Sequence, residues 1–548
     1  MAREAEEIQA LRRELGEKLS TARKLAGLTQ AEVARQVFCD RTTIAHLEKG
    51  RVGADERVWR AADRAVRADG LLLEAFLQFR AAALRHASEQ RATERAGFQR
   101  QAGRWRAEPA GPPATTATVD PSVPTEEPGS LDSACDWLDE RAGWCPGTSR
   151  DTAVGAGQDR SHAVPARSVP TPDRSVIAGA LARYYPTSAE DTAGLYGVRV
   201  DGARLGTSVV SRPEWLDLSC PFSPDRDRVR LATARRGGAR PLDEHAAVRR
   251  LAEATATGVR MTDLPIYRLT DADVSTSRLA GQVELLPFTE YALTMDLLEG
   301  ELTRALASGA DLAPTNLPLR SALLPDMASV LDVAGRLCAG GPLALCAIAR
   351  PADAYRDTGD YVLLVQRRSA QVVNAAGRLS VIPKGFHAPL TDYRADARIG
   401  ATLLRELEEE LFGRADVDVT VNPQRAADPM HPSRLSEPMR WLTERPGRLR
   451  VECTGFGLNL VSGNYEFASL IVIEDEEFWH RFGGDVRANW EAAGLLQYSA
   501  RDREILAELA QDESWSNEGL FAFTQGLRRL GEIGGDRVDV PELAWSLS

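Results

Sequence analysis

The chain has 548 residues, of which 43% are hydrophobic and 27% charged, with a formal net charge of −12 at pH 7. This composition is typical of globular proteins and excludes a fibrous or largely disordered chain. At about 100–200 residues per domain, the length predicts about three domains. The longest apolar runs are far too short to span a bilayer, and the charged N-terminal residues lack the apolar centre of a signal peptide. We therefore expect a cytoplasmic protein with no membrane partner.

The acidic total conceals a basic N-terminal segment. Residues 1–108 hold 21 Lys or Arg and 16 Asp or Glu, a net charge of +5, whereas the remainder carries −17. A basic segment joined to an acidic remainder is typical of a DNA-binding domain on a larger protein. Ordinary variation of surface charge would give the same imbalance, so charge alone leaves both interpretations open.

The first predicted element is an amphipathic helix that ends near residue 26. Its apolar face is marked by residues at helical spacing, namely Leu15, Leu19, Ala22 and Ala26. Gly27 follows at the position where a left-handed residue commonly ends a helix. We therefore expect the chain to turn at Gly27.

Two further helices follow the turn. Thr29 and Glu32 have the spacing of a capping box for a helix over residues 30–37. Asp40 can cap a third helix, which runs to Lys49 and carries arginine in its first turn. A short helix, a tight turn and a second capped helix together predict a helix-turn-helix.

Residues 12–79 resemble the Cro/repressor-type (XRE) helix-turn-helix family. The resemblance rests on Leu-Thr-Gln-x-Glu-Val-Ala at the start of the second helix and on Arg-Thr-Thr-Ile-x-x-Leu-Glu-x-Gly in the third. Phe38 departs from the pattern, because the family usually has glycine in this turn. The resemblance implies an all-α domain over residues 1–106 that binds double-stranded DNA, with a homodimer on paired half-sites.

The same resemblance assigns DNA contacts to matched positions. Arg41, Thr42 and His46 are expected at base edges in the major groove, where arginine can bind guanine through two hydrogen bonds. Phosphate contacts are expected from residues at or near the helix ends, namely Gln30, Thr43, Lys49 and Arg51. Structural roles remain open for several of these positions, because a threonine can cap its helix and basic residues can favour a helix C-terminus.

We interpret residues 107–173 as a disordered linker. They contain ten of the chain's 30 prolines, with Ala, Thr, Ser and Gly filling most of the rest. Such a composition buries too little apolar surface to fold well. The apolar stretch 135–144 interrupts it, and is either a short helix that docks on a neighbour or an isolated patch in a flexible segment.

Residues 174–335 mix strand-like and helical patterns without a motif that assigns a function. The strand-like stretches include Gly206–Val210 and Gln282–Leu286, and the helical ones include Asp243–Ala254 and Thr289–Ala307. We expect a separate mixed α/β domain of unknown role.

Strands and helices alternate through residues 336–548, which indicates an α/β or α+β domain. Strands over 361–368 and 379–385 precede a helix that runs from about residue 394 to residue 411. Three carboxylates share one face of that helix, namely Glu406, Glu409 and Glu410. Their mutual repulsion would be relieved by a hard divalent cation such as Mg²⁺ or Mn²⁺, which makes them candidate metal ligands.

This stretch resembles the Nudix hydrolase family, whose motif is Gly-x5-Glu-x7-Arg-Glu-U-x-Glu-Glu-x-Gly with U apolar. The positions that match in register are Arg405, Glu406, Leu407, Glu409 and Glu410. The motif's early glutamate falls on Ala397 and its last glycine on Phe412. The resemblance implies an α/β/α sandwich with Glu409 and Glu410 as possible catalytic residues, while the departures favour a site that does not hydrolyse.

Three further charged residues are candidates for ligand binding. Arg367 ends a predicted strand, and Lys384 lies in the turn Pro-Lys-Gly that precedes the acidic helix. Glu466 follows a predicted turn at Ser-Gly-Asn. Each can contact a ligand phosphate or metal, or can be an ordinary solvated charge.

These observations support a DNA-binding transcription regulator whose C-terminal Nudix-like domain senses a nucleotide-type metabolite. An active metal-dependent hydrolase of nucleoside-diphosphate-linked substrates that carries a DNA-binding domain is the alternative. A third hypothesis is a scaffold whose C-terminal part only oligomerises.

Overall fold

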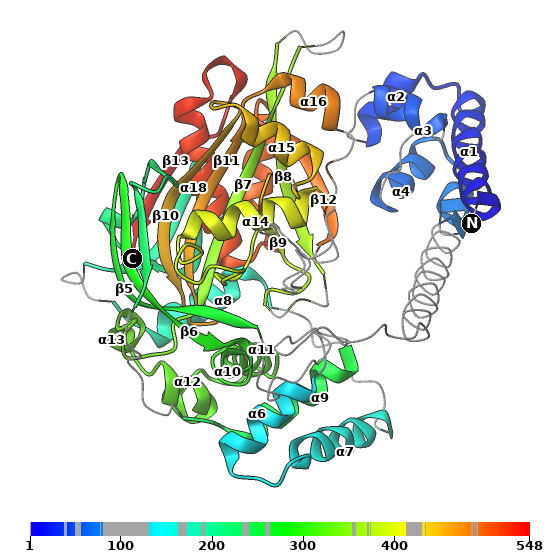
Figure 1. The fold of residues 1–548 in the computed structure, drawn as a ribbon. Coiled ribbons are helices and arrows are strands. Elements are labelled where there is room, and N and C mark those ends of the chain that lie inside the picture. The colour runs from blue at the N-terminus through cyan, green and yellow to red at the C-terminus, as the bar shows by residue number, and fades with distance from the viewer. Residues whose placement is uncertain are drawn as a thin grey trace, which may run out of the picture. The chain divides into compact units, whose positions relative to one another are not determined.

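The structure is a computed structural model that describes residues 2–37, 41–49, 56–68, 70–76, 78–79, 131–162, 172–187, 192–232, 241–257, 264–352, 358–369, 372, 374–412, 430–432, 434–483, 486, 488 and 492–548. The chain divides into two compact units, residues 1–123 and 124–548, which we call the N-terminal unit and the body. Figure 1 draws the helices of the N-terminal unit in blue and the elements of the body in cyan to red.

The N-terminal unit consists of helices in its described part. Their bounds are α1 (Ala2–Leu25), α2 (Gln30–Val37), α3 (Arg41–Glu48) and α4 (Glu56–Ala65), and residues 71–76 and 78–79 are helical as well. The core brings together Leu19 of α1, Val33 of α2, Ile44 of α3 and Trp59 of α4, all at most 3% exposed. The apolar spacing seen in the sequence therefore corresponds to one shared core.

The predicted signals at the start of α2 are confirmed. Gly27 has φ = +71°, the left-handed conformation expected after a helix. The backbone N–H of Thr29 donates to Glu32 Oε2 at 2.7 Å, and the backbone N–H of Glu32 donates to Thr29 Oγ1 at 3.2 Å. This reciprocal pair is a capping box, and it fixes where α2 begins.

A mixed sheet forms the centre of the body. In the described residues its strands are β1 (Gly194–Val200), β2 (Ala203–Ser211), β3 (Cys220–Pro221), β7 (Gly340–Arg350), β8 (Asp360–Arg368), β9 (Leu379–Val381), β10 (Leu449–Asn459), β11 (Tyr465–Ile473), β12 (Ala492–Ser499) and β13 (Leu543–Leu547). The main path runs β12-β8-β7-β11-β10-β2-β1-β13, with β9 paired to β8 and β3 to β10. The pair β7–β11 is parallel and its neighbours in the path are antiparallel.

Helices cover both faces of this sheet. One face carries α18 (Asn517–Ile533), with α17 (Arg503–Gln511) beside it, and the other carries α14 (Ile399–Leu411) and α16 (Glu476–Phe482). Strand β7 shows why, because Leu343 and Leu345 pack with Phe521 of α18 whereas Cys346 packs with Leu407 of α14. Successive side chains of a strand point to opposite faces, so an apolar run buried on both sides needs a layer on each.

The remaining elements of the body precede β1 in the chain or belong to the connections between strands of the central sheet. A second sheet contains β4 (Asp227–Leu231), β6 (Arg278–Pro287) and β5 (Pro265–Ser275). The other helices of the body are α6 (Asp132–Ala142), α7 (Thr148–His162), α8 (Arg174–Tyr184), α9 (Glu244–Thr257), α10 (Phe288–Ala292), α11 (Leu297–Ala307), α12 (Pro318–Leu323), α13 (Met327–Leu331) and α15 (Glu437–Glu444). Single 3₁₀ turns are formed by Pro213–Trp215, Pro314–Asn316 and Gly535–Arg537.

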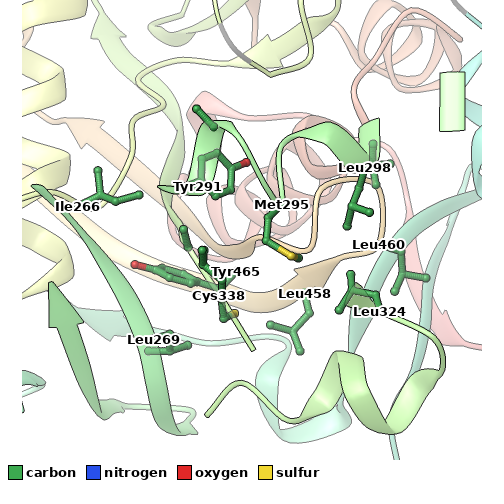
Figure 2. Close-up of a cluster of buried hydrophobic side chains, with 14 of the residues drawn as sticks. Ile266, Leu269, Tyr291, Met295, Leu298, Leu324, Cys338, Leu458, Leu460 and Tyr465 are labelled. Carbon is green, nitrogen blue, oxygen red and sulfur yellow. The ribbon is translucent and has the colours of Figure 1, made fainter. Parts of the chain in front are cut away.

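The structure differs from the expected boundary between residues 335 and 336. Strands β1 and β2 extend the same sheet as β7–β11, and the C-terminal strand β13 pairs with β1. Figure 2 shows Leu269 of β5 and Met295 in one apolar cluster with Leu458 of β10 and Tyr465 of β11. The two regions share sheet and core, so they form one unit. The expected helix 289–307 is also interrupted, as α10 and α11 with residues 293–296 between them.

The prediction of a disordered linker over 107–173 is wrong for its second half. Residues 132–142 and 148–162 form α6 and α7, and α6 packs on α9 and α10. Leu138 is 0% exposed and Cys135 5%, so the apolar stretch docks on the body, as one of the two interpretations expected. Its apolar residues recur at helical spacing, which outweighs the flanking Pro and Gly content. Residues 107–130 and 163–171 lie outside the described part of the chain.

Candidate functional site

The first candidate site is the α2–α3 pair of the N-terminal unit. Glu48, at the end of α3, accepts hydrogen bonds from Arg23 of α1 at 2.5 Å and from Gln30 of α2 at 2.8 Å. Burial opposes the ionisation of Glu48, yet Arg23 and Gln30 hold its pKa below the usual range. A single ionised carboxylate thus ties the three helices together and fixes the angle between α2 and α3.

Two of the described DNA-contact candidates lie at the ends of α3. Arg41 is its first residue and Lys49 follows its last, and both are exposed. Thr43 is half-buried and already has an interaction within the protein. The side chains of Thr42 and His46, and the whole of Arg51, lie outside the described part of the structure. An exposed guanidinium at a helix start has the reach that base contact requires.

Gln30 has a role within the fold that the sequence did not indicate. Its side-chain amide donates to Glu48, so one of its polar groups is engaged within the unit. The phosphate contact of Gln30 stays a prediction.

The acidic helix α14 makes specific contacts with the body. Glu406 is 7% exposed, accepts a hydrogen bond from Arg405 at 3.1 Å, and lies directly against Gly385, where a Cβ would be 2.2 Å from its carboxyl carbon. Glu410 is fully buried and accepts the backbone N–H of Lys384 at 3.2 Å. These contacts hold the Pro-Lys-Gly turn against the helix.

The expected metal ligands do not form a site of the required kind in the described residues. No group of three His, Cys, Asp or Glu among them is arranged to hold a metal ion. Glu406 faces Arg405, Glu410 faces an amide, and Ala397, at the position of the family's early glutamate, is buried and apolar. Glu406 and Glu410 thus already have partners within the protein, whereas Mg²⁺ and Mn²⁺ require several oxygen ligands around one point. Metal binding stays a prediction.

A second candidate site is a polar pocket on the α18 face of the sheet. Its lining residues come from α8, α11, the segment before β9, the Pro-Lys-Gly turn, the β10–β11 turn and the start of α18, and include Glu299, Asn374, Lys384, Asn464, Glu466 and Glu518. Its enclosed cavity is small, about 40 Å³, and opens to solvent at its mouth. It can therefore enclose a small polar group of a ligand, and few polar groups set the specificity of such a site.

The pocket brings together two of the three predicted ligand-binding residues. Lys384 and Glu466 both line it, whereas Arg367 is turned to the carbonyl oxygen of Gly377, at 3.0 Å, outside it. The sequence missed Glu299 and Glu518. Each lies on a helix whose charged residues look solvated in the sequence, and only the fold shows that these two face inward.

Comparison with known proteins identifies the first site. A family model described as a helix-turn-helix domain matches residues 14–76. Together with the α2–α3 geometry, this match makes the N-terminal unit a helix-turn-helix DNA-binding domain. No curated protein matches the chain. None of the described helices has the length and apolarity that crossing a membrane requires.

Proposed function

We propose that the protein is a sequence-specific transcription regulator of the Cro/repressor type. The observation that carries the proposal is the match of residues 14–76 to a helix-turn-helix domain, whose α3 begins with an exposed arginine. In such domains the second helix of the pair lies in the major groove with its N-terminal residues at base edges. Arg41 is therefore the principal base contact, Lys49 contacts phosphate, and a homodimer binds two half-sites.

The body is the sensory part of this regulator. Its mixed sheet, covered by α14 on one face and α18 on the other, supports a Nudix-like sandwich. The contacts of Glu406 with Arg405 and of Glu410 with the amide of Lys384 favour a structural role for α14 over hydrolysis. An effector would alter DNA binding if it bound two arrangements of the protein with different affinity.

The DNA-binding part of the proposal is tested with the Arg41→Ala variant of the full-length protein. Fluorescence anisotropy measures its affinity for an operator recovered from a random-sequence pool, and Arg64→Ala, which removes an exposed arginine of α4, is the matched control. We expect Arg41→Ala to lose about 1–3 kcal/mol of sequence discrimination and the control to lose none of it. Unchanged discrimination in Arg41→Ala would refute the assignment of α3 as the recognition helix.

The non-catalytic role of the body is tested by incubating the full-length protein with ADP-ribose and nucleoside diphosphate sugars in Mg²⁺ and in Mn²⁺. We expect no turnover. Turnover that disappears in Glu410→Gln would instead establish the hydrolase alternative.

A further inference from the structure

The main donor groups that line the polar pocket are already engaged in hydrogen bonds within the protein. Lys384 directs its ammonium to Glu518 of α18 at 2.6 Å, and the amide of Asn459 donates to the other oxygen of Glu518 at 3.1 Å. Arg378 donates to the main-chain oxygens of Glu513 and Pro172. Lys384, Asn459 and Arg378 therefore already donate to acceptors of the protein itself.

The acceptor groups that line the pocket are less fully engaged within the protein. Neither Glu299 nor Glu466 forms an ion pair within the described part of the chain, although Glu466 is only 4% exposed. Glu299 accepts the backbone N–H of Ala375 at 3.3 Å, and a hydrogen bond from Asn459 lowers the pKa of Glu466. The Oδ1 atoms of Asn374 and Asn464, both more than nine-tenths buried, have no hydrogen-bond partner among the described residues. Buried acceptors without donors cost free energy, so this surface is complementary to a ligand rich in donors.

The orientation of Asn374 is fixed by a separate contact. Its Nδ2 donates to the hydroxyl of Tyr291 at 2.8 Å, and the Tyr291 ring is fully buried. The oxygen of Asn374 is thus held in place before any ligand arrives. Preorganised acceptors of this kind reduce the ordering that binding would otherwise require.

The charged residues that line the pocket also favour a ligand that carries donors. Three carboxyl groups, Glu299, Glu466 and Glu518, line the pocket together with two cations, Arg378 and Lys384. Desolvation raises the pKa of Glu466 to about 8 and that of Glu299 to about 7, with Glu518 adding to both shifts and Lys384 opposing them. Arg368 also lowers the pKa of Glu466. Glu466 and Glu299 therefore tend to retain protons in the empty pocket. A bound cation would favour their ionised forms.

We propose that the polar pocket binds a small polar molecule through a cationic nitrogen, with Glu466 as its charge partner and the side-chain oxygens of Asn374 and Asn464 as further acceptors. The nitrogen belongs to a primary ammonium, an amidinium or a guanidinium, because these groups combine several N–H donors with a positive charge. A nucleotide phosphate would meet carboxylates here, and no described cluster suits a metal. That such a ligand is the effector rests on the proposed function, whereas its binding does not.

Calorimetric titration of the full-length protein with matched pairs of probes tests the proposal. The pairs are ethanolamine with ethylene glycol, glucosamine with glucose, and putrescine with 1,4-butanediol, so that each cation has a neutral counterpart of similar size. We expect at least one cation to bind about tenfold or more tightly than its neutral partner, with release of protons to the buffer. Failure of all three cations to bind, or equal binding of cation and neutral partner in every pair that binds, would overturn the proposal.

Variants locate the binding. Glu466→Gln is expected to weaken binding of the cation by about tenfold or more. Glu299→Gln, on α11, provides a second measurement if the first variant folds poorly. Glu508→Gln, which removes an exposed carboxylate of α17, should leave the affinity unchanged. Cation binding that persists in both pocket variants would place it elsewhere, and tighter binding of ADP-ribose by Glu466→Gln would assign the pocket to an anion. DNA affinity, measured separately by anisotropy, shows whether the proposed function stands.

Discussion

The N-terminal unit and the body differ in how far apart in sequence their decisive contacts lie. In the N-terminal unit the capping box joins Thr29 to Glu32, three residues apart, and the longer ion pair joins Arg23 to Glu48. In the body, β1 pairs with β13 across more than 300 residues, and the Lys384–Glu518 ion pair spans 134. Short-range signals fix the first unit, whereas the second is assembled from segments that carry no local sign of one another.

This difference explains why one candidate site could be anticipated and the other could not. A helix-turn-helix presents its chemistry on one continuous stretch, so the spacing of caps and apolar residues predicts it. The polar pocket draws its charged groups from separate helices, turns and strands. Substitutions in the two units should therefore differ in their effect on stability. The largest loss is expected where segments distant in the sequence meet.

The largest loss of stability is expected from Arg320→Met in the body. Arg320 is fully buried and donates to the carbonyl oxygens of Leu460 and Val461 and to the hydroxyl of Tyr185. Its removal leaves these buried acceptors without donors, which should lower the free energy of unfolding by about 2–5 kcal/mol. Urea denaturation of the full-length protein, followed by circular dichroism, measures the change.

The control for this prediction is Arg199→Met, which alters an exposed arginine on β1. It should change the free energy of unfolding by less than about 0.5 kcal/mol. If the two variants were equally stable, the buried arginine would not be what joins α12 to the β10–β11 turn.

The same contrast describes how much of the structure the sequence could predict. The bounds of α2 were predicted to the residue, and the strand 361–368 closely, because caps and apolar runs are local signals. The shared sheet of residues 194–211 with 340–473 was missed, since strand pairing depends on partners far away in the chain. Lys384 and Glu466 were chosen from their turns alone. Glu518, the partner of Lys384, could not be chosen, because nothing near it in the sequence marks it as buried.

In the N-terminal unit, Gly16→Val should cost about 1–3 kcal/mol of stability. A Cβ at Gly16 would lie 2.3 Å from the carbonyl oxygen of Leu47, so α1 and the end of α3 would have to separate. Glu17→Val places the same β-branched residue at an exposed neighbour and controls for helix propensity. Thermal unfolding of both proteins checks the prediction, and equal melting temperatures would show that the close approach of α1 to α3 is dispensable.

The pocket of the body predicts a dependence of stability on pH. Burial raises the pKa of Glu466 from 4.5 to about 8, so the folded protein keeps a proton that the unfolded chain releases. The free energy of unfolding should therefore fall as pH rises from about 4.5 to about 8, by at most about 1.4 kcal/mol per pH unit for this group. Glu299 contributes in the same sense up to about pH 7.

Glu466→Gln should flatten this dependence, because glutamine does not titrate. Denaturation of both proteins at several pH values within that window measures the two slopes. An unchanged slope in the variant would mean that Glu466 is ionised throughout, in contradiction to its environment in the pocket.

The smallest effect is expected from the most local contact. Thr29→Ala removes the side-chain half of the capping box and should destabilise the N-terminal unit by about 1 kcal/mol. Thr21→Ala, at an exposed position within α1, is the control and should be neutral or slightly stabilising. A loss of the same size in both variants would indicate that helix propensity, and not the cap, determines the start of α2.

We have proposed that the N-terminal unit reads DNA sequence through α3. Selection of bound duplexes from a random-sequence pool by the full-length protein tests this role. We expect recovery of a defined sequence in two related half-sites, and loss of the preferred base pair contacted by Arg41 when Arg41→Ala is used. Recovery of sequences no different from the starting pool would contradict it.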